Sequence, residues 1–398
     1  MRHLYPSIRY EYPLPPLFNA GLRLFRVKSI VTFAIPHLAL TLGAVASFAI
    51  CLGIVLTKEL HGEHTLDSSS GVQKIHQNPT PRVGGVAIFI SLVLSWWLTP
   101  PIVADVLGPM LIAAIPAFLA GVTEDIVKRG HVTERLFATF ASGLLAWWLL
   151  RYSLRRIDLP GIDYFLAITP ISVLFTAFAV GGVANAINII DGVNGLAGGI
   201  VLLCLSSLGL IAYQVYDYEI AKLCFVIGGA IFGFLLVNYP YGKIFLGDGG
   251  AYLLGFLMGW IAVMLTARNP GISPWAPLLA CGYPILEVLF SMARRTARKV
   301  KLGHPDRVHL HSLVYARLVR PALSNRSAAI KNAAVFPIML LYAIIPAAFA
   351  VVFRTSTPKL MLAFVCCGFI YALSYARLVH FRWTFPKLRV GTQSRRPG

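Results

Sequence analysis

The sequence predicts an all-α protein, a polytopic transmembrane helical bundle of about 10–11 helices. Three observations point to this class. The chain is 57% hydrophobic, and only 13% of its 398 residues are charged, about half the charged fraction of a soluble domain. Apolar runs long enough to cross ~30 Å of hydrocarbon also recur along its whole length. Because backbone groups inside a bilayer must be satisfied within their own segment, these runs are expected to be helices.

The apolar runs define the expected helices and the domain organisation. They fall near residues 30–57, 83–99, 102–122, 135–151, 164–183, 195–213, 220–237, 250–266, 275–291, 333–353 and 359–379. Together they form one transmembrane domain at 30–380, between a basic N-terminal segment at 1–29 and a basic tail at 381–398. The six cysteines all lie in apolar runs and are interpreted as small core residues. No internal repeat is apparent, which argues against a secondary transporter, and the basic start lacks the compact apolar stretch of a signal peptide.

The net charge of +19 sits mainly between the apolar runs. This arrangement is typical of cytoplasmic loops, so no nucleic-acid partner is expected. The segment after the ninth run and the C-terminal tail are the most basic parts, through Arg294, Arg295, Arg298, Lys299, Lys301, Arg307, Arg317, Arg320, Arg326, Arg377, Arg382, Lys387, Arg389, Arg395 and Arg396. Both are predicted to be cytoplasmic.

Alternation of the helices then predicts which loops share that face. The loops at 58–82, 123–135, 184–194 and 238–249 should also be cytoplasmic, with the N-terminus outside. Two groups of basic residues fit this topology poorly, because it places them outside: Arg23, Arg26 and Lys28, and then Arg151, Arg155 and Arg156.

Rare polar residues gather at the helix ends of this predicted cytoplasmic face. Ionisable groups at membrane depth are costly and are functional candidates by default. The first group is the loop at 76–85, where Pro79 and Pro81 stiffen the chain and Gly84 and Gly85 allow close backbone approach. It is either a turn before a helix or a phosphate-binding loop that uses backbone amides and Arg82.

Two further groups are acidic. Glu124 and Asp125 are adjacent, and Lys128 lies on their helical face. This pattern is explained by a helix-end salt bridge, or by acids that bind magnesium or receive a proton. Asp248 lies among glycines after Asn238, and it suits either a magnesium ligand or the N-cap of the following helix.

The stretch from 185 to 199 is the strongest single signal. Asn185, Asn188, Asp191 and Asn194 recur every third residue and form one polar stripe in an apolar segment. Glycine-mediated helix packing does not explain these hydrogen-bonding side chains, which favour a functional site.

The basic loop carries the last group. His309 and His311 lie two residues apart, but nothing nearby completes a zinc site. Diphosphate binding together with Arg307 is therefore favoured over a surface histidine cluster. Glu287 shares a helix face with Arg294, which suggests a structural ion pair.

These motifs, in this order from about His76 to Ser312, resemble the polyprenyl-phosphate N-acetylhexosamine-1-phosphate transferase family. The bacterial undecaprenyl-phosphate N-acetylglucosaminyl-1-phosphate transferases and the phospho-N-acetylmuramoyl-pentapeptide transferases belong to it. Three positions depart from the family pattern: Glu124 stands for an aspartate, Asn194 replaces an aspartate of the muramoyl-pentapeptide enzymes, and Ser312 replaces a histidine. The last two favour the N-acetylglucosamine-type branch.

The resemblance implies an enzyme of the bacterial inner membrane, with catalytic loops on the cytoplasmic face. Its substrates would be a UDP-N-acetylhexosamine and undecaprenyl or another polyprenyl phosphate, its released product UMP, and its cofactor Mg²⁺, with Mn²⁺ as an alternative. The lipid-linked sugar would start a cell-envelope glycan such as lipopolysaccharide O-antigen. A homodimer, a direct or a covalent aspartyl-phosphate mechanism, and the muramoyl-pentapeptide reaction stay open, as do an anionic-lipid transporter and a non-catalytic relic.

The implied site residues follow the motifs residue by residue. Catalytic roles fall on Glu124, Asp125, Asp191 and Asp248. Metal binding falls on Asp248 and Asp191. Substrate binding falls on Lys128, Asn185, Asn188, Asn238, Arg307, His309 and His311.

Overall fold

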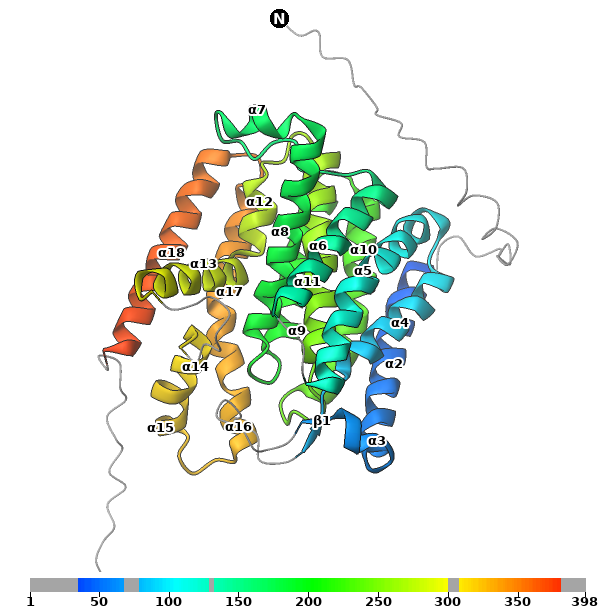
Figure 1. The fold of residues 1–398 in the computed structure, drawn as a ribbon, viewed down its shortest axis with the longest axis vertical. Helices are drawn as coiled ribbons and strands as arrows, with labels where there is room; N and C mark the ends of the chain where they lie inside the picture. The colour runs from blue at the N-terminus through cyan, green and yellow to red at the C-terminus, as the bar shows by residue number, and fades with distance from the viewer. Residues whose placement is uncertain (1–34, 68–78, 129–131, 300–307, 381–398) are drawn as a thin grey trace, which may run out of the picture.

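The computed structural model describes residues 35–67, 79–128, 132–299 and 308–380 as a helical bundle (Figure 1). Its first elements are α2 (Ile35–Leu56), α3 (Lys58–Thr65), β1 (Leu66–Asp67), β2 (Thr80–Pro81), α4 (Gly84–Leu98), α5 (Pro101–Val127), α6 (Val132–Leu150), α7 (Ile162–Leu166), α8 (Thr169–Ile190) and α9 (Leu196–Gln214). There follow α10 (Tyr218–Asn238), α11 (Gly247–Arg268), α12 (Trp275–Ala280), α13 (Gly282–Ala297), α14 (Leu310–Val314), the π-helix η2 (Tyr315–Val319), α15 (Arg320–Ala322), α16 (Ala328–Ala333), α17 (Val335–Val352) and α18 (Thr357–Val379).

The predicted fold class is confirmed. Each apolar run of the sequence carries a helix, and β1 and β2 form only a short antiparallel ladder. Seven helices among the described residues are long and apolar enough to cross a membrane, and α2 and α4 contain shorter apolar segments. The spans are α5, α8, α9, α10, α11, the α16–α17 unit and α18.

The ninth apolar run is not one straight helix. It divides into α12 and α13 at Cys281. Pro284 has no backbone N–H to continue the hydrogen bonding of α12, but it is tolerated in the first turn of a new helix. Gly282 lies tightly against Pro346 of α17. As a result α13 runs across the bundle while α12 runs along it (Figure 1).

Helix α11 forms the centre of the bundle. It packs against α4, α5, α6, α8 and α9. Within its apolar 18-residue stretch 89% is buried inside the protein, against 33% for the corresponding stretch of α18. Glycines permit this close packing. A Cβ at Gly121 would lie 2.5 Å from the Cα of Gly249, and one at Gly255 would lie 2.6 Å from the Cα of Ala184. The N-terminus of α11 is therefore held firmly by its neighbours, and it is there that the polar motifs converge.

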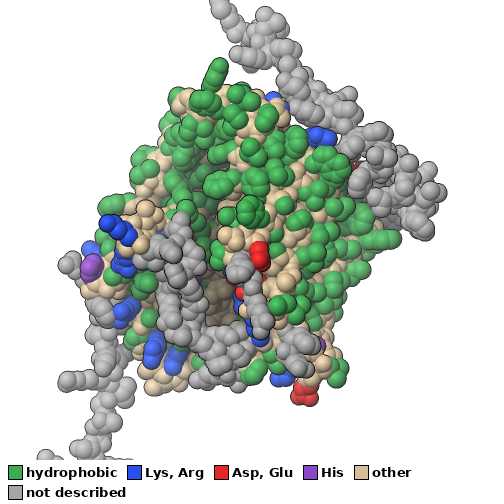
Figure 2. All heavy atoms as spheres, in the orientation of Figure 1, with side chains coloured by type: hydrophobic (Ala, Val, Ile, Leu, Met, Phe, Trp, Pro, Cys, Tyr) green, Lys and Arg blue, Asp and Glu red, His purple; other side chains and the backbone are tan. Residues whose placement is uncertain are grey.

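The ends of the bundle differ in composition. The end of α5, the α8–α9 and α10–α11 connections and α14 all lie at the end that also holds β1 and α3, whereas α7 lies at the opposite end (Figure 1). Figure 2 shows apolar side chains over the upper and middle parts of the visible face and Lys and Arg side chains gathered toward the lower end. The described residues of all five sequence motifs thus share one end of the molecule.

Candidate active site

Asp125 joins the end of α5 to the start of α11. Its Oδ1 accepts a hydrogen bond from the backbone N–H of Asp248, and its Oδ2 accepts one from Gly249, each at 2.9 Å. The first N–H groups of a helix have no partner within the helix and carry partial positive charge. Asp125, only 3% exposed, therefore caps α11 from another helix and fixes the backbone of Asp248.

The glycines at the start of α4 serve the same construction. The N–H groups of Gly84 and Gly85 donate to the carbonyls of Phe245 and Leu246, both at 2.9 Å. A Cβ at Gly85 would lie within 2.5 Å of the Gly250 backbone. Of the two interpretations of the 76–85 loop, backbone-amide phosphate binding by Gly84 and Gly85 is therefore wrong, because those amides pair with the segment before α11. The turn before a helix is the correct one at these glycines.

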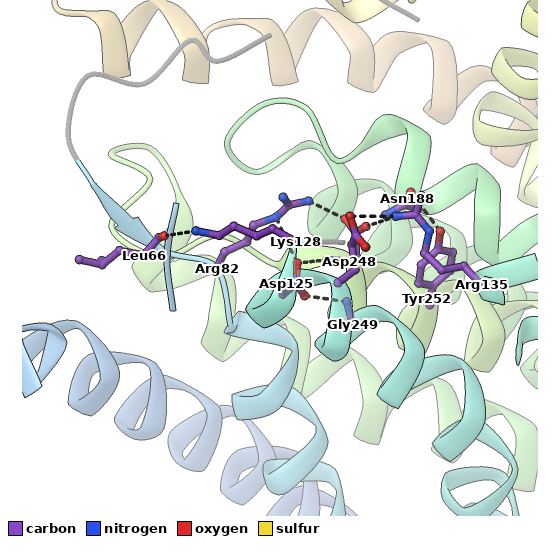
Figure 3. A network of polar contacts seen from close by, with 10 residues as sticks. Leu66, Arg82, Asp125, Lys128, Arg135, Asn188, Asp248, Gly249 and Tyr252 are labelled. Carbon is purple, nitrogen blue, oxygen red and sulfur yellow. Dashed lines mark hydrogen bonds and ion pairs between the residues drawn. The ribbon is translucent and has the colours of Figure 1, made fainter. Parts of the chain in front are cut away.

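Two arginines from different elements meet at Asp248 (Figure 3). Arg82, just after β2, donates to Oδ1 of Asp248 at 2.5 Å and lies 3.2 Å from Oδ1 of Asp125. Arg135, in the first turn of α6, donates to Oδ2 of Asp248 at 2.8 Å and lies 3.9 Å from Oε1 of Glu124. Hydrogen bonds between ionised partners are among the strongest in proteins, so this cluster holds the Asp248 carboxylate in one orientation.

Asp191 belongs to the same cluster. It follows the last residue of α8. Burial raises the pKa of Asp191 to about 7; nearby Arg82 opposes the rise, and the charge of Asp248 adds to it. Carboxylates from α5, α8 and α11 are thus gathered around Arg82 and Arg135.

The asparagines of the motifs divide into two kinds. Asn185 donates to the carbonyl of Gly181 in its own helix at 2.9 Å, and Oδ1 of Asn188 accepts from the Tyr252 hydroxyl at 3.4 Å (Figure 3). Asn194 and Asn238 instead brace the loops. Asn194 donates to Pro240 O at 3.0 Å, while the amide of Asn238 accepts from Gly195 N and donates to Ile244 O, both at 2.7 Å. The latter two are buried and hold the α8–α9 and α10–α11 connections together.

The histidines reach this site from the far side of the bundle. A Cβ at Gly192 would lie 2.7 Å from Nε2 of His311, so this ring packs directly against the residue after Asp191. Burial lowers the pKa of His311 to about 4, and His309 adds to that effect while Glu287 opposes it. At this pKa the His311 ring is neutral at physiological pH, and it can then donate or accept hydrogen bonds.

Lys128 and Glu287 have partners that differ from those expected. Lys128 caps α5 in a left-handed conformation (φ 58°), and its Nζ donates to Leu66 O of β1 at 3.0 Å (Figure 3). The helix-end salt bridge expected for it is not found among the described residues, where Arg135 approaches Glu124 instead. Glu287 pairs with His309 at 3.0 Å rather than with Arg294. Arg307, the remaining predicted substrate-binding residue, lies outside the described residues.

Arg135 is the residue that the sequence analysis missed. It belongs to no motif, and its neighbours in the chain give no sign of a partner 113 residues away. A usable signal was its position: it is a basic residue at the membrane-edge start of an apolar run, on the face that carries the acids.

The carboxylates suit a hard divalent cation. Within the described residues no three His, Cys, Asp or Glu side chains could hold a metal ion by themselves. Mg²⁺ does not need such a set, because it usually takes one or two carboxylates and completes its shell with water and substrate phosphates. Asp248 and Asp191 carry hard oxygen donors and influence each other electrostatically. These residues fit a magnesium ion that binds together with a diphosphate.

Comparison with known proteins agrees with this geometry. Residues 107–266, from α5 to α11, match the family described as glycosyl transferase family 4. The chain is 27% identical over 263 residues to an undecaprenyl-phosphate alpha-N-acetylglucosaminyl 1-phosphate transferase of Yersinia pestis, an alignment that covers 64% of this chain and 70% of that protein. It is 29% identical over 267 residues to a decaprenyl-phosphate N-acetylglucosaminephosphotransferase of Mycobacterium tuberculosis, covering 60% and 66%.

A relative from Salmonella typhi, also an undecaprenyl-phosphate alpha-N-acetylglucosaminyl 1-phosphate transferase, is 26% identical over 266 residues, 64% of this chain and 70% of that protein. The resemblance inferred from the motifs is thereby confirmed. Residues 107–266 match glycosyl transferase family 4, and the chain is similar to relatives named as undecaprenyl- or decaprenyl-phosphate N-acetylglucosamine 1-phosphate transferases.

Proposed function

We propose that this protein transfers N-acetylhexosamine 1-phosphate from a UDP-sugar to a polyprenyl phosphate, with release of UMP and with Mg²⁺ as cofactor. One observation carries the proposal: Arg82 and Arg135 converge on Asp248 at the buried start of α11, beside Asp125 and Asp191. The names of the relatives supply the sugar and the lipid class. Undecaprenyl phosphate and UDP-N-acetylglucosamine are the first substrates to test.

The reaction joins two anionic groups, so its main demand is positioning and charge neutralisation. The phosphate oxygen of the lipid would attack the β-phosphorus of the UDP-sugar, form the new P–O bond, and break the bond to UMP. Asp248 and Asp191 would hold the magnesium ion, which supplies positive charge to the diphosphate. Arg82 and Arg135 lie beside Asp248 and would offset the negative charge of a diphosphate bound there.

The contacts give Asp125 a different task from a proton acceptor. Both its oxygens accept backbone hydrogen bonds from α11, and these two bonds hold its carboxylate against the start of that helix. We assign Asp125 to orienting Asp248. His311 would serve the substrate as a neutral hydrogen-bonding group beside Asp191. The structure favours no specific candidate for a covalent intermediate over direct attack.

The activity is tested with purified protein in detergent. A panel of labelled UDP-N-acetylhexosamines is offered with undecaprenyl phosphate and Mg²⁺, and both organic-extractable label and UMP are measured. Equal molar amounts of lipid-linked label and released UMP support the transferase reaction. UMP without lipid label indicates hydrolysis of the nucleotide sugar, and an inactive panel counts against the proposed function.

The site end is proposed to face the cytoplasm of a bacterial inner membrane. Its exposed basic residues agree with the positive-inside tendency. Of the basic residues that fitted poorly, Arg23, Arg26 and Lys28 lie outside the described residues. The other three have local partners at the opposite end: Arg156 pairs with Asp158 at 3.0 Å, Arg155 donates to Thr169, and Arg151 lies over the Trp147 ring. Local pairing reduces the weight of these three residues as orientation signals.

Cysteine accessibility tests this orientation. In a background without native cysteines, Glu59→Cys and Asn325→Cys at the site end should react with a membrane-impermeant thiol reagent only when the cytoplasmic side is exposed. Tyr164→Cys, on α7 at the other end and 77% exposed, should react from outside. The reverse pattern would place the site on the outer face.

A further inference from the structure

Two side chains of α13 bind residues 308–310, next to and including the first of the two histidines. Oε1 of Glu287 accepts hydrogen bonds from Nδ1 of His309 at 3.0 Å and from the backbone N–H of Leu310 at 3.3 Å. Two helical turns further on, Arg294 donates to the carbonyl of Val308 at 2.5 Å. Residues 308–310 are therefore held at two points by side chains that share one face of α13.

The position of Glu287 is costly for a purely structural residue. Its side chain is 1% exposed and lies among Tyr283 and Tyr371. Its Oε2 has no hydrogen-bond partner among the described residues. A buried carboxylate loses hydration that must be offset by its partners. Glu287 accepts the N–H of Leu310 at the start of α14, but capping a helix does not require a buried carboxylate, because the exposed Ser327 caps α16.

The imidazole rings of His309 and His311 connect these contacts of α13 to the candidate active site. His309 and His311 stack in parallel, with ring centroids 5.6 Å apart and an angle of 5° between their planes. His311 in turn packs against Gly192, next to Asp191. A displacement of His309 would thus be passed to His311 and to the carboxylate cluster.

The same contacts determine the chemistry of the His309 ring. Oε1 of an ionised carboxylate can only accept, so Nδ1 of His309 must be the donor. In the neutral ring this leaves the lone pair on Nε2. Carboxylate–histidine pairs elsewhere fix the tautomer and orientation of a working imidazole in this way.

We propose that Glu287 is a positioning residue of the transferase site, which holds His309 by its Nδ1–H and thereby orients both histidines toward the anionic substrate. This inference rests on the proposed function, because it assumes that the histidines meet a phosphate group. It assigns to α13, which lies outside the family 4 match at 107–266, a direct part in the geometry of the reaction.

The test is a double-mutant cycle on steady-state transfer. Wild-type protein must first transfer label to lipid. If it does not, the proposed function fails, and this failure is distinguishable from a failure of the Glu287 proposal, which only the variants test. Glu287→Ala should then lower kcat by about tenfold to a hundredfold, the scale found when the orienting partner of a histidine is removed. Glu287→Gln keeps an oxygen acceptor for both hydrogen bonds and should recover part of that loss. The KM for the UDP-sugar should change less than kcat.

The decisive comparison is made in a His309→Ala background. If Glu287 acts through His309, its substitution there should change kcat less than about twofold, because coupled residues are not additive. An undiminished loss in that background would overturn the proposal and leave Glu287 a residue of the fold, as would wild-type kcat in Glu287→Gln and Glu287→Ala alike.

A matched control separates positioning from general destabilisation. Glu219→Gln removes another paired carboxylate, one bound to Arg268 at the opposite end of the bundle, and it should leave kcat unchanged. Thermal unfolding in detergent is measured for every variant. If Glu287→Ala does not fold, the cycle is carried out with Glu287→Gln alone, where an effect on kcat that is lost without His309 supports the proposal and an effect that persists refutes it.

Discussion

The two ends of the bundle both contain arginine–carboxylate clusters, but they are built differently. At the end opposite the site, Arg268 binds both oxygens of Glu219 at 3.0 and 3.1 Å and Oδ1 of Asp217 at 3.1 Å. Asn269 and the N–H of Ile220 also donate to Asp217. This cluster ties the start of α10 to the end of α11.

The site cluster draws on more separate parts of the chain. Glu124, Asp125, Asp191 and Asp248 share Arg82 and Arg135, and the contact of Arg135 with Glu124 is a long 3.9 Å. The side chains come from five separate elements or loops rather than from the ends of two packed helices. Ionisable residues at a helix end are therefore a weak signal by themselves, and the convergence of side chains from several separate elements is the stronger one.

The largest expected effect is that of Asp248→Asn. If this carboxylate holds magnesium, turnover should fall by at least about a hundredfold, the scale of losing one electrostatic contact to a transition state. Asp217→Asn makes the matched change in the opposite cluster and should retain turnover. Initial rates of lipid labelling at limiting Mg²⁺ provide the measurement. Near-normal turnover in Asp248→Asn would remove Asp248 from the site and leave the two clusters equivalent.

A smaller effect is expected for the arginines, and it should differ in kind. Arg135→Gln should lower kcat/KM by about tenfold or more, since it removes one charge-assisted contact, with little change in melting temperature. Arg268→Gln should lower the melting temperature and leave kcat/KM nearly unchanged, because it leaves two partly buried carboxylates without their cation. The measurements are transfer kinetics per folded protein and thermal unfolding. If Arg135→Gln unfolds the protein and retains activity, Arg135 is a structural residue.

The comparison also shows what could be predicted from sequence. Apolar runs longer than a bilayer crossing gave the helices because length and composition decide membrane insertion. The motif acids stood out because they lie at the edges of apolar runs, where acidic residues are rare. Arg135 was not found, since its partner Asp248 is distant in sequence and a single arginine at a helix start is common.

One error and one alternative left open concerned relations between helices. Glu287 and Arg294 share a helix face, so a pair was expected, but the break at Cys281 turns α13 across the bundle and brings Glu287 to His309 instead. For Gly84 and Gly85, flexibility alone does not tell whether a ligand or another backbone approaches. The structure shows the second. Periodicity describes one helix at a time, and these contacts depend on how neighbouring helices pack.

The smallest expected effect concerns acid stability at the site end, where His311 is buried. With the pKa of His311 lowered to about 4 from an unfolded value of about 6.5, the unfolded chain binds a proton that the folded chain resists between these values. Stability from this residue is complete above about pH 6.5 and is lost as pH falls toward 4. At pH 5 the loss is about 2 kcal/mol, from 1.36 kcal/mol per pH unit over about 1.5 units.

His311→Gln removes that titration, so its melting temperature should fall less than that of wild type between pH 7 and pH 5. Ser312→Ala, the neighbouring change on α14, should keep the acid sensitivity of the wild type. The measurement is thermal unfolding in detergent across this range. An equal acid response in all three proteins would mean that His311 is readily protonated in the folded protein. In that event His311 could carry positive charge toward the diphosphate, and its role beside Asp191 would be electrostatic rather than that of a neutral hydrogen-bonding group.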